Sequence, residues 1–178
     1  MRLALKPHPD APAGPVTGIE VEVNRDGSKL ALRYRARGRI ADVLLPQAAA
    51  PARRDDLWKH TCFEAFLRAG GGGYVELNLS PSSEWAAYRF TGYRAGLTPA
   101  AVPAVTVTTE RGDGLFELNA SVDVGGEIVF DTPAAFGLSA VIEDVSGAKT
   151  YWALAHAPGK PDFHHPDAFA SELPRDQP

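Results

Sequence analysis

The feature of this sequence that most constrains the fold is a regular alternation of polar and apolar residues between 57 and 89. In the segments 61–67, 74–79 and 85–90, apolar side chains recur at every second position. Successive side chains of a β-strand point to opposite faces of a sheet, so this period of two predicts three strands. The glycines at 70–73 predict a turn between the first two strands, which makes them neighbours in an antiparallel sheet.

Similar short segments fill the rest of the chain, and none has the length or the period of a helix. Alternation recurs in 19–24, 30–35, 105–107, 116–122, 136–145 and 150–156. The segment 2–7 also alternates, and the prolines that follow it indicate an edge strand. Many short strands joined by turns are typical of a β-sandwich. We therefore predict an all-β, antiparallel, jelly-roll-like β-sandwich, with one domain over 1–173 and a frayed tail at 174–178.

The composition argues against several classes of function. The net charge of −4 shows no basic excess, so we do not expect binding to nucleic acid. Cys62 is the sole cysteine, which excludes an internal disulfide bond and a zinc site built from several cysteines. No apolar run has the length of a signal peptide or of a transmembrane helix. We therefore expect a cytoplasmic protein that does not enter a membrane.

Polar side chains gather on one face of the predicted strands. They are Glu64, Glu76, Asn78, Arg89, Glu117 and Asn119. Antiparallel sheets commonly have one solvated face, so the pattern fits an ordinary wet surface. A binding surface fits as well, because glutamate and asparagine have poor β propensity and tryptophans stand at both ends of the 57–89 stretch. Tryptophan rings stack on sugar rings, and carboxylates, amides and guanidinium groups bond the hydroxyls. Both interpretations remain open at this point.

The three tryptophans have different surroundings. Trp85 lies inside an alternating segment, which favours packing in the core. Trp58 follows a charged loop and Trp152 follows a turn. Each of these two is either a lid on the core or a platform for a ligand.

Several segments of the chain form a recognisable set. They are LWK at 57–59, TCFEAFL at 61–67, YVELNLSP at 74–81, EWAAYR at 84–89, GLSAVIE at 137–143, YWALAH at 151–156 and PDFHH at 161–165. Together they resemble the DOMON-like proteins related to carbohydrate-binding module family 9, in a group of uncharacterised bacterial proteins. The resemblance covers most of the chain. It implies a β-sandwich and two classes of ligand, sugars and haem.

In the sugar-binding branch of these proteins, two tryptophans hold a terminal sugar and a nearby glutamate bonds its hydroxyls. By resemblance, Trp58 is the first tryptophan, Glu64 is that glutamate, and Trp152 is the candidate for the second tryptophan. Arg89 resembles an arginine that the family brings from a neighbouring strand. Residues 61–62, Thr-Cys, replace an aspartate that often precedes the glutamate, and this replacement leaves the use of calcium open.

The haem-binding branch commonly ligates iron through methionine and histidine. Met1 is the sole methionine and is an unsuitable axial ligand. A bis-histidine site would have to draw on His8, His60, His156, His164 and His165. We therefore predict no cofactor, with haem and calcium as minor alternatives.

Three histidines and an aspartate near the C-terminus are weak candidates for a metal site: His156, His164, His165 and Asp162. Their spacing matches no standard metal motif, and adjacent histidines on an extended chain point apart. The favoured interpretation is that the imidazoles satisfy backbone groups in a proline-rich loop.

We predict that the chain binds a carbohydrate or a similar small polar ligand without catalysis. The predicted site comprises Trp58, Glu64, Glu76, Asn78, Arg89, Trp152 and His156. Glu64 and Glu76 would be the acid and the base of a glycoside hydrolase, but Arg89 is expected to compensate their charge, which disfavours hydrolysis. The alternative function is a module that binds a protein partner through an exposed apolar patch.

Overall fold

The computed structural model describes residues 1–68, 70, 72–103 and 105–175. Gly71, in the turn predicted at 70–73, lies outside the described residues, and so do residues 176–178 of the tail predicted at 174–178. Pro174, the first residue of that tail, accepts a hydrogen bond from Arg25 Nη2 at 2.7 Å.

The described residues form strands joined by loops, with three 3-10 helices of one turn each. The strands are β1 (Arg2–Pro7), β2 (Val16–Asp26), β3 (Lys29–Gly38), β4 (Cys62–Arg68), β5 (Tyr74–Leu79), β6 (Trp85–Phe90), β7 (Thr98–Pro99), β8 (Val105–Arg111), β9 (Leu115–Asp123), β10 (Ala134–Glu143), β11 (Lys149–Ala153) and β12 (Ser171–Leu173). The 3-10 helices are η1 (Ile40–Asp42), η2 (Leu57–Lys59) and η3 (Pro166–Ala168).

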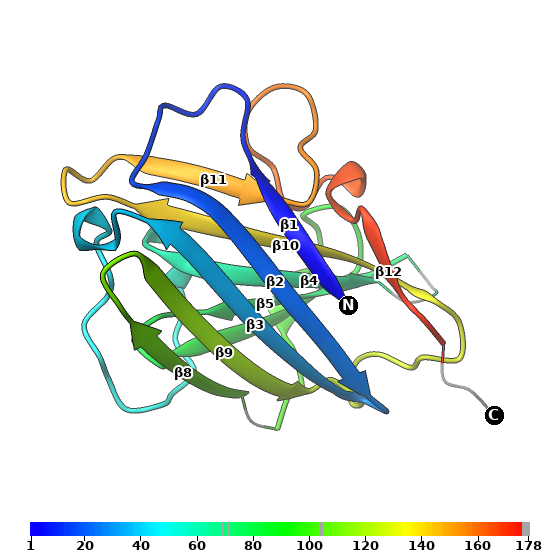
Figure 1. Ribbon diagram of the computed structural model, residues 1–178. Helices are drawn as coiled ribbons and strands as arrows, with labels where there is room; N and C mark the ends of the chain where they lie inside the picture. The colour runs from blue at the N-terminus through cyan, green and yellow to red at the C-terminus, as the bar shows by residue number, and fades with distance from the viewer. Residues whose placement is uncertain (69, 71, 104, 176–178) are drawn as a thin grey trace.

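The strands form one antiparallel sheet that curls into two packed layers (Figure 1). Its order is β7-β6-β5-β4-β10-β11-β1-β2-β3-β9-β8, and β12 adds to β10. The layer β1-β2-β3-β9-β8 lies in front in Figure 1, and the layer β11-β10-β4-β5-β6-β7 lies behind it. The predicted all-β antiparallel sandwich is therefore confirmed, and β4, β5 and β6 are neighbours as their short connections predict.

The prediction that residues 2–7 form an edge strand is wrong. β1 pairs with β2 through Arg2–Leu5 and with β11 through Lys6 and Pro7, so it joins the two layers. The prolines at 7 and 9 do end the strand, as expected. Alternation and prolines describe the strand itself, but they do not reveal that partners from both layers flank it.

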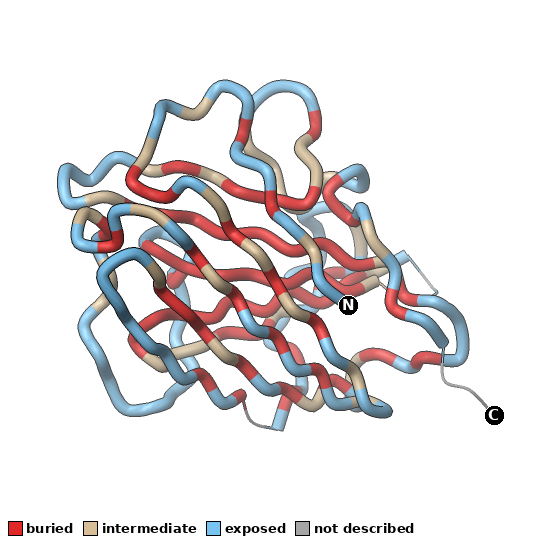
Figure 2. The backbone as a smooth tube through the Cα atoms, in the orientation of Figure 1, coloured by how far each residue is buried: buried red, intermediate tan, exposed pale blue. Residues whose placement is uncertain are grey.

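The core lies between the layers and takes every second residue from each strand (Figure 2). The ring of Phe63 on β4 lies 5.1 Å from that of Tyr34 on β3 and 5.9 Å from that of Phe116 on β9. The buried Tyr34 hydroxyl crosses the interior and donates a 2.7 Å hydrogen bond to the Glu64 carbonyl. This hydrogen bond thus joins the two layers at one fixed point in an otherwise apolar core.

The outer faces of the two layers differ in burial. On the layer β2-β3-β9-β8, outward residues such as Arg33 and Arg35 are solvated and pair with Glu117. On the other layer, β5 is buried at all of its positions and β4 at all except Arg68. The helix η2 and the segment 155–170 cover this face. Figure 2 shows the result as continuous buried strands behind a front layer of mixed burial.

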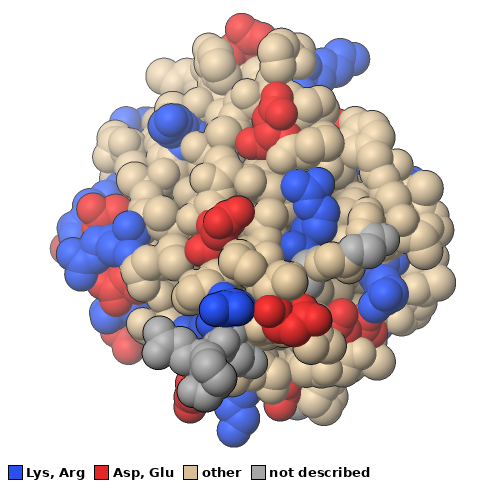
Figure 3. Space-filling model, turned by 90° about the vertical axis from the view of Figure 1, so that its right-hand side faces the viewer, with Lys and Arg blue, Asp and Glu red and all other residues tan. Residues whose placement is uncertain are grey.

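The surface gives two further observations. Within the described residues, no helix is long and apolar enough to cross a membrane. Figure 3 views the side that lies on the right of Figure 1, and there acidic and basic side chains are interspersed among neutral ones. That side carries no broad area of a single charge.

The bond that crosses the core generates a stability prediction. We expect Tyr34→Phe to lower the free energy of unfolding by about 1 kcal/mol, because the Glu64 carbonyl loses its buried donor. Urea denaturation followed by circular dichroism measures this change. A midpoint equal to that of the original chain would show that the bond contributes nothing to holding the layers together.

Candidate functional site

A row of polar side chains crosses the covered outer face of β10, β4 and β5. In the sheet register, Ser139 stands directly opposite Glu64, and Glu64 stands directly opposite Asn78. Glu64 is only 3% exposed. Ser139 Oγ donates to Glu64 Oε2 at 3.1 Å, and Asn78 Nδ2 donates to Glu76 Oε1 at 2.7 Å. Three neighbouring strands thus bring Glu64, Glu76 and Asn78 together, as predicted, and add Ser139.

The two carboxyls of this row share a poorly solvated site. Burial raises the pKa of the Glu64 carboxyl well above its usual value, and the charge of Glu76 raises it further. Burial also raises the pKa of Glu76, although the bond from Asn78 and the charge of Arg94 oppose this. A buried acid close to a second one resists losing its proton. The row then offers both donors and acceptors of hydrogen bonds.

His164 extends the polar row toward the cover. Its Nδ1 lies 2.8 Å from the Tyr74 hydroxyl, which itself accepts a bond from the Arg94 backbone N–H at 3.2 Å. Burial, with the charge of Arg94, lowers the pKa of His164 to about 4, so the ring is neutral at pH 7. In the tautomer that carries its proton on Nε2, the Tyr74 hydroxyl donates to Nδ1. His164 Nε2 lies 3.9 Å from Glu76 Oε2.

Asp162 fastens the cover over this end of the sheet. Its carboxylate accepts from Arg94 Nη2 at 2.8 Å, from the His164 backbone N–H at 3.1 Å, and from the Tyr93 hydroxyl. These bonds join the loop after β6 to the segment 155–170. The His164 ring packs among Phe66, Tyr74 and Phe90, with ring centroids 5.2, 5.8 and 5.2 Å away. His164 is therefore held both by packing and through its neighbour Asp162.

Trp58 lies beside the polar row at the surface. Its neighbour Leu57 is buried in a small apolar cluster with Cys62 and Ala86, which anchors η2 on the outer face. The Trp58 side chain remains 50% exposed, although it is large and apolar. The Lys59 ammonium group makes a cation–π contact with the Trp58 ring, with Nζ 5.6 Å from the ring centre. Of its two predicted roles, the burial excludes a lid on the core and leaves a platform.

Further aromatic rings stand on both sides of the polar row. Tyr88 on β6 is directly opposite Glu76, and its hydroxyl donates to Asp55 Oδ1 at 2.5 Å. Tyr151 on β11 lies on the same outer face, with its ring 6.2 Å from that of Phe163 in the cover. All three rings are half-buried. The polar groups therefore lie between partly exposed aromatic side chains.

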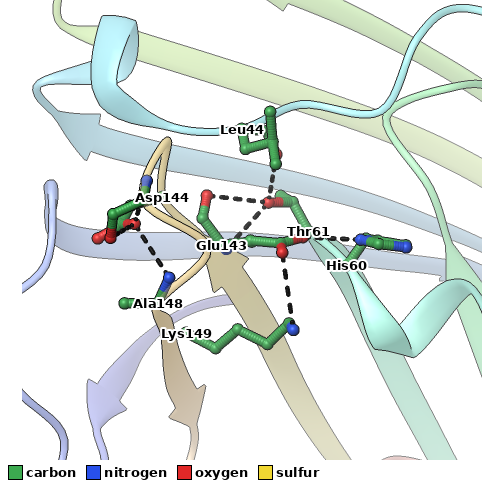
Figure 4. A network of polar contacts seen from close by, with 8 residues as sticks. Leu44, His60, Thr61, Glu143, Asp144, Ala148 and Lys149 are labelled. Atoms are coloured by element: carbon green, nitrogen blue, oxygen red, sulfur yellow. Dashed lines mark hydrogen bonds and ion pairs between the residues drawn. The ribbon is translucent and has the colours of Figure 1, made fainter.

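A second polar network lies where β10 ends (Figure 4). The Glu143 carboxylate lies 2.8 Å from His60 Nδ1 and 3.6 Å from Lys149 Nζ. Thr61 Oγ1 accepts from the Glu143 backbone N–H at 3.0 Å and donates to the Leu44 carbonyl at 2.7 Å. The 61–62 dipeptide noted in the sequence thus secures the strand end, and Glu143 positions two basic side chains.

Arg89 does not belong to this face, contrary to prediction. It stands opposite Val75, whose side chain faces the core, and it pairs with Glu127 at 2.7 Å. The sequence correctly predicts that β6 alternates. The face that carries Tyr88 is the outer one, however, and Arg89 lies on the opposite face. Glu117 and Asn119 also lie elsewhere, since they stand opposite Arg35 and Arg33 on the outer face of the other layer.

Trp152 is not available as the second platform. It is 5% exposed, belongs to the main core and stands opposite Ala140, and its Nε1 donates to Thr150 Oγ1 at 3.2 Å. The preceding turn suggested an exposed position, but the register of β10 with β11 turns Trp152 inward. Tyr151 takes the outward position beside it.

His156 lies near the N-terminal loop and bonds to the backbone. Its Nε2 lies 2.8 Å from the Lys6 carbonyl, and its ring meets that of His8 edge to face at 4.9 Å. Burial lowers the pKa of His156. Contrary to prediction, no hydrogen bond or ion pair joins His156 to Glu64 among the described residues, and the partner of His156 is the Lys6 carbonyl.

The candidate metal ligands bond to different groups. His164 bonds to Tyr74, whereas His165 Nδ1 accepts from the Asp167 backbone N–H at 3.2 Å. Within the described residues, no cluster of three or more His, Cys, Asp or Glu side chains is arranged to hold a metal ion. The Met1 sulfur lies 4.0 Å from Ser171 Oγ.

Sequence reasoning missed Ser139, Tyr74 and Tyr88, and it named His164 only as a candidate ligand of a metal or haem. Alternation in 136–145 places Ser139 on the face shared with Glu143, but it does not show that β10 pairs with β4. Tyr88 directly precedes Arg89, so the alternation of the strand places these two side chains on opposite faces. His164 lies in an irregular loop, where no period indicates direction.

The coupled carboxyls generate a prediction on pH. A carboxyl whose pKa rises on folding stabilises the fold below its unfolded pKa and loses this contribution as the pH rises through the folded value. We therefore expect Glu64→Gln to have little effect at pH 5 and to raise the unfolding free energy at pH 8 by about 1 kcal/mol or more. Chemical denaturation at both pH values measures the difference.

Glu117 is the matched control for this experiment. It is also poorly exposed, but Arg33 and Arg35 lower its pKa, so its stabilising effect exists above the unfolded pKa and is lost as the pH falls. Glu117→Gln is expected to destabilise the chain at pH 8. If Glu64→Gln destabilises at pH 8 in the same way, the two buried acids do not repel each other as described.

Comparison with known proteins addresses the fold. No family model matches the sequence, and no curated protein is similar to it. The structure is similar to a proposed carbohydrate-binding protein from Bacteroides uniformis, with a TM-score of 0.71 and 15% identity over 94% of this chain and 83% of the other. It is also similar to a family 9 carbohydrate-binding module from Caldicellulosiruptor kristjanssonii in complex with glucose, with a TM-score of 0.52 and 15% identity over 90% and 79%. The chain therefore has the fold of family 9 carbohydrate-binding modules, as the resemblance of its sequence implied.

Proposed function

We propose that the covered face of β10, β4, β5 and β6 binds a carbohydrate without catalysis. One observation carries the proposal: a buried row of hydrogen-bonding groups lies on the sheet face against which η2 packs, and η2 carries Trp58, which is 50% exposed. The helix η2 is anchored through Leu57, so the exposed ring has a defined position relative to the row. Sites for small ligands combine apolar walls with a few placed polar groups, and this arrangement has both.

The chemistry of the row suits a molecule with many hydroxyls. A sugar hydroxyl both donates and accepts hydrogen bonds, and a buried carboxyl that keeps its proton does the same. Asn78 and Ser139 hold the carboxyl groups in place, so little ordering of side chains is needed on binding. The neutral His164 ring adds a donor through Nε2. In this proposal Trp58 stacks on the apolar face of the sugar, with Tyr88 on the far side of the row.

The fold supports the same class of ligand. The two structures compared above are described as carbohydrate-binding, and one of them holds glucose. Binding without turnover accords with the engaged carboxyls, since Glu64 bonds to Ser139 and Glu76 bonds to Asn78. We expect weak binding, because one stacking ring and a few hydrogen bonds leave little free energy beyond the entropy lost on association.

Docking of a protein partner is the second candidate, and one observation favours it. Leu44 and Val145 are 44% and 66% exposed. The Leu44 backbone N–H bonds to Glu143 and the Val145 backbone N–H bonds to Asp42, so the two side chains belong to adjoining segments. A partner docked there would depend on these residues, whereas a sugar on the polar row would not. The two candidates therefore separate by mutation.

Calorimetric titration with glucose, xylose and cellobiose at pH 7 tests the first candidate. We expect millimolar binding of at least one sugar, and a loss of about tenfold or more in Trp58→Ala because the stacking contact is removed. Glu64→Gln should also weaken binding, since the buried carboxyl group is replaced by a fixed amide.

Val129→Ala is the matched control, because Val129 is 66% exposed and lies outside the polar row. It should bind like the original chain. The assignment of the site is rejected if Trp58→Ala binds as well as the original chain. Absence of any heat with all three sugars, at concentrations up to the high millimolar range, would reject sugar binding itself.

A further inference from the structure

A groove of about 430 Å³ lies over β11, near the candidate site. Its floor includes Tyr151 and Lys149 of β11, and its walls come from the segments 8–12 and 159–161. In Figure 1 these segments are the loops above β11, one from the start of the chain and one from near its end. Residues far apart in the sequence thus enclose one surface depression.

The groove opens on the same sheet face as the polar row. Tyr151 stands opposite Val141, two residues from Ser139, and Ser139 stands opposite Glu64. Only β10 separates the strand of the groove from the strand of Glu64. Two strand spacings of about 4.8 Å and an offset of two residues along the strands separate Tyr151 from Glu64 by about 12 Å. A ligand of two or three sugar rings would reach both.

The charged groups of the groove favour an anion. Lys149 and Lys160 line it, and Asp10 is the acidic residue in the lining. Glu143 holds Lys149 at 3.6 Å, and the same carboxylate is fixed by His60 in the network of Figure 4. In the part of the chain that the structure describes, no carboxylate lies within ion-pair distance of Lys160. Lys160 therefore has its charge available for a ligand.

His8 adds a buried donor to the wall of the groove. The Asp10 backbone N–H donates to His8 Nδ1 at 3.2 Å, so in the neutral ring Nε2 carries the proton. His8 is only 4% exposed, and within the described residues its Nε2 has no hydrogen-bond partner. A buried donor without a partner destabilises the fold. An acceptor atom that entered the groove would remove this cost.

We propose that the groove binds the carboxylate of an acidic sugar, so that the ligand of the neighbouring site is a saccharide containing a uronic acid. This inference rests on the proposed function, which it narrows from carbohydrates in general to acidic ones. The neutral ring of the saccharide lies over Glu64 and Ser139, the uronic ring lies over Tyr151, and its carboxylate meets Lys160, Lys149 and His8. Asp10 weakens the attraction between the groove and the carboxylate, because its negative charge offsets the positive charge of one lysine.

An affinity comparison at pH 7 and low salt tests the proposal with the full chain. The probes are a disaccharide that contains glucuronic acid and the neutral disaccharide of the same linkage. We expect the acidic disaccharide to bind about tenfold more tightly, as charge-assisted bonds exceed neutral ones. Raising the salt to about 0.5 M should reduce the preference, because Lys160 is exposed and salt screens its charge.

Variants then locate the preference. The double variant Lys149→Gln/Lys160→Gln is expected to bind both disaccharides with nearly equal affinity and to keep the affinity for the neutral one. Lys29→Gln, at the exposed first residue of β3, is the matched control and should keep the preference. Free glucuronate and inorganic phosphate, tested separately, distinguish an acidic sugar from a general anion. Phosphate that competes as well as glucuronate would overturn the assignment to a sugar acid.

The outcomes separate this inference from the proposed function. Equal affinity of the original chain for both disaccharides overturns the acidic assignment and leaves sugar binding intact. A preference that survives the double lysine variant overturns the groove as its source. If neither disaccharide binds, and Trp58→Ala changes nothing, both the proposed function and this inference fail together.

Discussion

The whole arrangement depends on burial of polar groups on the outer face of one layer. A sheet in a sandwich normally buries one face and wets the other, but here η2 and the segment 155–170 cover the second face of β4 and β5. Glu64, Glu76 and Asn78 consequently lie where water is scarce, and each must find a partner in the protein. That requirement explains the hydrogen bonds that Ser139 donates to Glu64 and Asn78 donates to Glu76. It also explains the hydrogen bond between His164 and Tyr74.

This burial also links stability to recognition. Two acids in one poorly solvated row do not both ionise readily, and the protein keeps them although apolar residues would pack there without that cost. Buried acids with perturbed pKa values commonly mark a functional site. The two layers therefore serve different purposes: the β2-β3-β9-β8 layer neutralises its surface charges with ion pairs, whereas the β4-β5 layer concentrates polar groups beneath a cover.

The sequence supports prediction of the fold far better than of the site. Period-two alternation locates the strands β2 to β6 and β8 to β11, because it reports a property of each strand by itself. The site instead depends on relations between strands: Ser139 meets Glu64 only through the pairing of β10 with β4, and the register of β11 turns Trp152 inward and Tyr151 outward. Arg89 illustrates the same limit. The sequence shows that its strand alternates, but not which of the two sets of side chains faces the polar row. Glu64, Glu76 and Asn78 were found because their strands follow one another directly.

The position of β1 has a consequence for the order of folding. Its six residues pair at one end with β2, which follows at once, and at the other end with β11, about 150 residues later in the chain. Contacts between such distant segments are slow to form, because a long loop must close before they return any stabilisation. The end of β1 at Lys6 and Pro7 therefore waits for β11 to be synthesised. Until then, the emerging chain has an open sheet edge at Lys6 and Pro7, where a proline without an N–H makes pairing with a wrong partner harder.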